Sequence, residues 1–146
     1  MTMLQHYFAS AGEHVSPHLA AEECKCHCWR CKPLRTWQVV TPKAGGLFER
    51  IRHRCGDRPI HVNSAVRCPE HNADYEDQGA VSDSQHVVGQ ALDLRCPEGM
   101  ALAEFHQICD EEAGLSGCGF YDWGCHVDVR TIPAGRTKPY RWGKKA

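Results

Sequence analysis

The chain has 146 residues, a formal net charge of −1, 42% hydrophobic residues and 24% charged residues. This size predicts one domain over residues 1–146, and the near-neutral charge argues against a nucleic-acid partner. No apolar run approaches the roughly 20 residues that a membrane-spanning helix needs, so we expect no membrane span. Residues 1–7 lack the basic start and apolar core of a secretory signal, which predicts a chain that is cytoplasmic at synthesis. We also expect a monomer.

The N-terminal segment, residues 1–41, contains four of the ten cysteines: Cys24, Cys26, Cys28 and Cys31. The last two have the two-residue spacing of one half of a zinc knuckle, although no second C-x-x-C follows. The even cysteine count also permits disulfides, but no export signal favours an oxidising compartment. The segment therefore predicts an accessory staple held by a second metal ion or by disulfides, with free thiols as the remaining alternative.

Residues 43–54 are predicted to form a helix, because Leu47, Phe48 and Ile51 share one face at spacings of three and four residues. The later elements follow from side-chain alternation, helical period and turn residues: a strand over 60–66, a polar loop over 73–84, a strand over 91–95, a helix over 99–113, strands over 120–122 and 125–129, and a basic tail over 136–146. This order indicates an α+β domain with a small antiparallel sheet and helices packed on one side.

A candidate metal site lies in the second half of the chain. Asp93 points away from its two leucine neighbours on the strand over 91–95, because successive side chains alternate between faces. His86 precedes it by seven residues, and His126 lies on a later strand. Two imidazoles and one carboxylate suit Zn²⁺, and three protein ligands leave a fourth position open for water. We therefore predict that His86, Asp93 and His126 bind one Zn²⁺.

Three further residues are candidates for chemistry beside this metal. Asp128 shares a strand face with His126, so it could accept a proton or orient the histidine. Asp122 is the second candidate for proton transfer. Arg67 follows a predicted strand and could bind an oxyanion or a substrate carboxylate, or serve as a structural ion-pair partner.

Five blocks of this sequence together resemble the zinc D-alanyl-D-alanine carboxypeptidase family, which includes phage endolysins and murein endopeptidases. They are Ser64-Ala65-Val66-Arg67-Cys68-Pro69-Glu70-His71-Asn72, Ser84-x-His86-x-x-Gly89-x-Ala91-x-Asp93, Gly119-x-Tyr121, His126-Val127-Asp128 and Arg141-Trp142. The resemblance covers about residues 42–142, and any one block alone would be a weak signal.

The resemblance implies a hedgehog/DD-peptidase-like fold with a catalytic core over 42–146, and hydrolysis of peptide bonds in peptidoglycan stem peptides by a carboxypeptidase or an endopeptidase. It implies that His86, Asp93 and His126 hold zinc, that Arg67 binds a substrate carboxylate or carbonyl, and that Ser84 lines the site. Such a protein would act in the periplasm or cell wall after release. Many members carry their acidic general base three residues before the last histidine, where this chain has Trp123.

Three other interpretations remain. The chain could be a binding module of the same fold that holds the metal without turnover, or a cysteine-rich, metal-stapled interaction protein. A Cys–His nucleophilic peptidase is the third. No cysteine is marked as activated in the sequence, however, and the spacing of His86 and Asp93 has no role in that mechanism.

Overall fold

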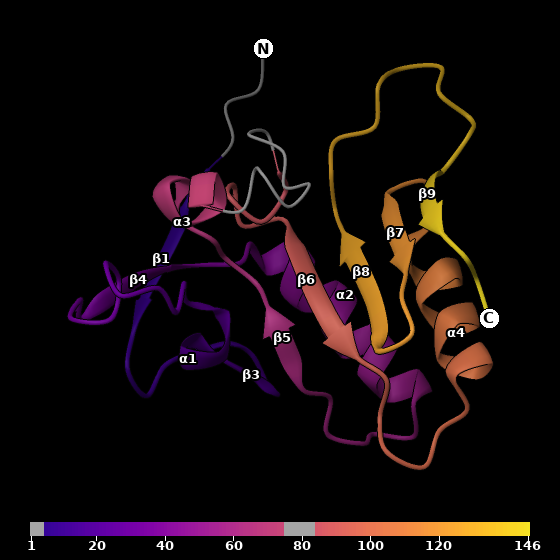
Figure 1. Cartoon of the computed structure of the whole chain (residues 1–146), viewed down its shortest axis with the longest axis horizontal. Helices are drawn as coiled ribbons and strands as arrows, with labels where there is room; N and C mark the ends of the chain where they lie inside the picture. The colour runs from indigo at the N-terminus through magenta and orange to yellow at the C-terminus, as the bar shows by residue number, and fades with distance from the viewer. Residues whose placement is uncertain (1–4, 75–83) are drawn as a thin grey trace.

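The computed structural model describes residues 5–74 and 84–146, and its largest element is a five-stranded sheet (Figure 1). The strands lie in the order β5-β6-β8-β7-β9, with bounds β5 Val62–Ser64, β6 Ala91–Arg95, β7 Gly117–Phe120, β8 Gly124–Asp128 and β9 Tyr140–Gly143. Neighbouring strands run antiparallel except β7 and β9, which are parallel. The prediction of a wholly antiparallel sheet was therefore wrong at this edge, because the basic tail supplies a fifth strand.

Helices accompany the sheet: α1 Ala21–Cys24, α2 Pro42–Arg54, α3 Pro69–Asp74 and α4 Leu102–Ala113. Proline at the first position and a Thr41 hydroxyl that accepts from the Ala44 N–H begin α2. The long helices α2 and α4 contact each other, and α4 also contacts β7 and β8. Among the described residues, none of the helices has both the length and the apolar composition of a membrane span.

Successive side chains of β6 and β8 alternate between the face of the sheet that packs on the core and the opposite, open face. Leu92 and Leu94 of β6 and Val127 of β8 are fully buried and pack in the hydrophobic core with residues of α2 and α4. Asp93 lies between the two leucines and His126 directly precedes Val127. Because successive side chains of a strand alternate between faces, Asp93 and His126 point to the other face. The core positions thereby fix the direction of the polar side chains on which the site depends.

The predicted elements of the core are present, with shifted ends. The strand over 91–95 is confirmed, and the helices predicted over 43–54 and 99–113 correspond to α2 and α4. The strand predicted over 60–66 is shorter, and the one predicted over 120–122 lies earlier in the chain, as β7. The polar loop expected over 73–84 begins inside α3, and residues 75–83 are outside the described residues.

The N-terminal segment adds two small sheets that its sequence did not predict. They are formed by β1 Tyr7–Ser10 with β4 Thr36–Val39, and by β2 His14–Ser16 with β3 Leu19–Ala20. Leu19 and Trp37 of this segment belong to the same hydrophobic core as α2. These strands have two to four residues each, too few to show a period of two.

Candidate metal centre

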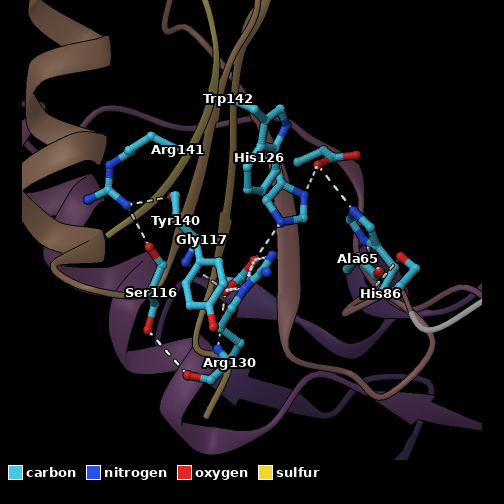
Figure 2. Close-up of polar contacts among 12 residues, drawn as sticks. Ala65, His86, Ser116, Gly117, His126, Arg130, Tyr140, Arg141 and Trp142 are labelled. Atoms are coloured by element: carbon cyan, nitrogen blue, oxygen red, sulfur yellow. Dashed lines mark hydrogen bonds and ion pairs between the residues drawn. The ribbon is translucent and has the colours of Figure 1, made fainter. Parts of the chain in front are cut away.

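Three side chains converge on the open face of the sheet, and one ligand atom from each lies within 4.8 Å of the others. The Asp93 Oδ1 atom is 3.2 Å from His86 Nε2 and 3.1 Å from His126 Nδ1. Asp93 and His126 are directly opposite each other on β6 and β8, because these strands pair in that register. The predicted ligands are therefore brought together from a turn and two neighbouring strands (Figure 2).

The turn over residues 84–90 holds His86 against this strand pair. The His86 carbonyl oxygen accepts from the N–H of Arg67 and, across the turn, from the N–H of Gly89. Gly89 has a φ of +73°, and a Cβ there would lie 3.0 Å from the Val39 carbonyl oxygen. Glycine is required at this position both by its conformation and by its contact with the neighbouring backbone.

Each histidine has its second ring nitrogen occupied by a protein acceptor. His86 Nδ1–H donates to the Ala65 carbonyl oxygen over 2.6 Å, and His126 Nε2–H donates to Asp128 Oδ2 over 2.8 Å. In the neutral imidazoles these bonds leave His86 Nε2 and His126 Nδ1 as lone pairs directed at a carboxylate. Three acceptors facing one another repel unless a cation lies among them, so this donor set fits a divalent metal ion.

Asp128 is fully buried behind His126, away from solvent. Its Oδ1 accepts from the Gly117 N–H over 2.9 Å, and its Oδ2 accepts from Arg130 Nη2 over 2.7 Å. Burial raises the pKa of the Asp128 carboxyl, but the bonds from His126 and Arg130 outweigh burial and hold this pKa well below its usual range. Of the two roles predicted for Asp128, this geometry favours orienting His126 over proton transfer with substrate.

The charge around His126 is consistent with a cation at this position. Burial lowers the pKa of the His126 imidazole, but the carboxylates of Asp128 and Asp93 outweigh burial and raise it. The Asp93 pKa is held well below its usual range, because the two histidines outweigh the effect of its burial. The site therefore favours positive charge between Asp93 and His126, whether a proton or a metal ion supplies it.

Two glycines on β7 make room for the side chains that cover this face. A Cβ at Gly117 would overlap the Asp128 carboxylate, and a Cβ at Gly119 would overlap the Trp142 indole. Trp142 comes from β9, and its ring centroid lies 5.0 Å from that of His126 (Figure 2). The unpredicted strand β9 therefore supplies one wall of the site.

The other predicted site residues lie at different places. The Arg67 guanidinium donates to the buried Asn72 side chain over 3.1 Å, while its backbone bonds to His86. The Ser84 hydroxyl accepts from the His86 N–H over 3.3 Å, so it closes the turn. Asp122 is exposed and lines a separate pocket with His106. The structure brings Arg67 and Ser84 beside His86 but does not bring Asp122 to the three ligands.

The predicted cysteine group also changes in one member. Cys24 is fully buried in the hydrophobic core, where burial raises the pKa of its thiol to about 12. Cys68, from the connection between β5 and α3, joins Cys26, Cys28 and Cys31 in its place. Side-chain direction explains the difference, because Cys24 ends α1 on the side that faces the core.

A mixed α/β fold with two histidines and a carboxylate arranged for a divalent ion defines a candidate metalloenzyme. The family model of Peptidase M15 matches residues 17–130, and the chain belongs to this family. The match includes the four N-terminal cysteines and all three predicted ligands, and it ends before β9. A search of curated proteins gave no match.

Proposed function

We propose that this protein is a zinc metallopeptidase that hydrolyses a peptide bond in peptidoglycan stem peptides and acts in the periplasm or cell wall. The observation that carries the proposal is the convergence of His86 Nε2, His126 Nδ1 and Asp93 Oδ1, with both histidine tautomers fixed from behind. Membership of the Peptidase M15 family supports the peptidase activity.

The three ligand side chains differ in exposure in a way that suits a catalytic site. The side chains of His86 and His126 are 4% and 11% exposed, and that of Asp93 is 19% exposed. When bound by such a set, Zn²⁺ supplies a Lewis acid that polarises a carbonyl group and makes water acidic enough to attack near neutral pH. The chain's contribution is to hold three ligands, which leaves the fourth position of a tetrahedral ion to water or substrate.

Two neighbouring residues are suited to positioning the substrate. Arg67 carries a fixed positive charge whose direction is set by the bond to Asn72, and a guanidinium binds a carboxylate in a defined orientation. The Trp142 indole packs against the His126 imidazole, with ring centroids 5.0 Å apart. We propose that Arg67 binds the terminal carboxylate or a carbonyl of the stem peptide and that Trp142 forms the facing wall.

A substitution at His86 tests this proposal. His86→Ala is expected to abolish zinc binding at this site and hydrolysis of purified stem peptides, since it removes one ligand of three. His61→Ala is the matched control, because His61 is exposed and lies outside the site. The assay is chromatography of the peptide products, with and without a chelator. Full hydrolysis by His86→Ala would overturn the proposal.

A second candidate function, a zinc-holding module that binds peptidoglycan peptides without cleaving them, is favoured by one observation. The carboxylates predicted to transfer a proton are poorly placed for it, because Asp128 is fully buried and Asp122 lines another pocket. The same peptide assay separates the two functions. Stoichiometric zinc with peptide binding but no cleavage would support the module and contradict the peptidase.

A further inference from the structure

We propose that this chain binds a second, structural metal ion, Zn²⁺, through the sulfur atoms of Cys26, Cys28, Cys31 and Cys68. These four thiols lie in a group of their own, apart from the site of His86, Asp93 and His126. The inference is independent of the peptidase proposal, because the cysteines contribute no ligand to that site.

The spacing of the sulfur atoms suits a tetrahedral ion. All four Sγ atoms lie within 4.8 Å of one another, and the Sγ atoms of Cys28 and Cys68 are 3.6 Å apart. Zinc–sulfur bonds of about 2.3 Å place tetrahedral sulfur ligands about 3.8 Å from each other. Four thiolates in this arrangement select a thiophilic ion such as Zn²⁺ over Mg²⁺ or Ca²⁺.

His71 contacts two of the four sulfur atoms. The His71 ring nitrogen Nδ1 lies 3.2 Å from Cys26 Sγ, and the His71 backbone N–H donates to Cys68 Sγ over 3.3 Å. Four thiolates around a divalent ion carry a net charge of −2, so donors to sulfur stabilise the cluster by spreading this charge. His71 lies in α3, three residues after Cys68.

The cluster joins segments that are far apart in the sequence. Three ligands come from the loop after α1, and Cys68 comes from the connection between β5 and α3. The Cys24 carbonyl oxygen accepts from the Val66 N–H over 2.9 Å, so the two segments already meet beside the cluster. A metal ion here would close a loop of about 40 residues, which removes conformational freedom mainly from the unfolded chain.

The connection between β5 and α3 also contains the backbone groups that hold His86. The Ala65 carbonyl oxygen holds His86 Nδ1, and the Arg67 N–H holds the His86 carbonyl. Both residues precede Cys68 by three positions or fewer. A metal ion on Cys68 would therefore fix the backbone that orients His86, so the structural ion would stabilise the fold and sharpen the geometry of the first site.

Metal counting on purified, reduced protein tests the inference. Inductively coupled plasma mass spectrometry is expected to find two zinc ions per chain in the native protein. Cys68→Ser should retain one ion, and His86→Ala should also retain one. Cys96→Ser is the matched control and should retain two, because the Cys96 thiol donates to the carbonyl oxygens of Pro97 and Met100 and belongs to neither ligand group.

The outcomes separate this inference from the proposed function. One ion in the native protein that is lost in His86→Ala and kept in Cys68→Ser would overturn the second site and leave the first intact. Disulfides among the four cysteines, detected by peptide mapping without reduction, would overturn it as well. Two ions in the native protein, with one lost in Cys68→Ser, would support it even if no peptide were cleaved.

A measurement on the unaltered chain covers the case in which Cys68→Ser does not fold. Replacement of zinc by Co²⁺ is expected to give the strong near-ultraviolet absorption of thiolate-to-cobalt charge transfer, which histidine and carboxylate ligands do not produce. A mercurial thiol reagent should then abolish this band and release one cobalt ion per chain. Absence of the band in cobalt-loaded native protein would contradict the inference.

Discussion

Asp128→Asn separates the two roles predicted for this residue, because asparagine has the same shape without the charge. The carboxylate orients His126 through Nε2 and pairs with Arg130, and it is fully buried. Loss of a buried partner that orients a metal-bound histidine reduces metal affinity or activity about 10–100-fold, which corresponds to roughly 1.4–2.7 kcal/mol. We expect zinc affinity to fall by this factor, with activity at saturating zinc largely retained.

The same substitution should also destabilise the fold. The asparagine amide places a donor against the donors of Arg130 or against the Gly117 N–H. Breaking a buried charge pair costs about 3–5 kcal/mol, and we expect the low end because the Arg130 side chain is 22% exposed. A loss of about 3 kcal/mol lowers the Tm of a chain of this size by roughly 10 °C.

The assay combines zinc affinity, measured by competition with a chromogenic chelator, with peptide hydrolysis at saturating zinc. Asp57→Asn is the matched control, because Asp57 is exposed and distant in sequence from the site. A general base contributes about 10²–10⁴-fold to a rate. A fall in kcat of that size with unchanged zinc affinity would refute the orienting role and restore Asp128 as the base.

Two further predictions concern β9 and its attachment. Gly119→Ala should displace the Trp142 indole and destabilise the protein by about 1–3 kcal/mol. The readouts are a lower Tm and a red shift of tryptophan emission. An unchanged Tm and emission would contradict the packing of Trp142 against Gly119. Asp110→Asn removes the bonds that Asp110 accepts from Arg141 and Lys145 and should cost about 1–2 kcal/mol at pH 7. Burial raises the Asp110 pKa, but these two cations outweigh it and lower the pKa below its ordinary value of 3.8. This contribution is therefore present above pH 3.8 and lost as pH falls through the lowered pKa, so the Tm difference between the native protein and Asp110→Asn should shrink there; a constant difference would exclude this origin.

The prediction from the sequence was most accurate where the alternation of apolar residues and the residue types of the metal ligands indicate the same arrangement. Strand β6 was placed over 91–95 because two leucines flank Asp93, and burial of those leucines then fixes the direction of the carboxylate. The convergence of His86 and His126 on Asp93 was also predicted from residue type and order. Their tautomers were not, because the Ala65 carbonyl that holds His86 is a backbone atom with no signal in the sequence.

The features that were not predicted are mostly contacts between segments that are distant in the sequence. Cys68 joins three cysteines that precede it by about 40 residues, and local spacing alone favoured Cys24. Strand β9 pairs in parallel with β7, and its four residues lie within the basic stretch 136–146, which was interpreted as a tail. Arg130 was missed although it follows Asp128 by two residues, and this same-face spacing was the available signal.

The proposed function depends on one zinc ion bound between His86, Asp93 and His126. An anomalous difference map from crystals of the native protein, collected on both sides of the zinc absorption edge, would locate this ion. We expect a peak about 2 Å from His86 Nε2, His126 Nδ1 and a carboxylate oxygen of Asp93. A zinc-loaded crystal with no peak among these three atoms would contradict it.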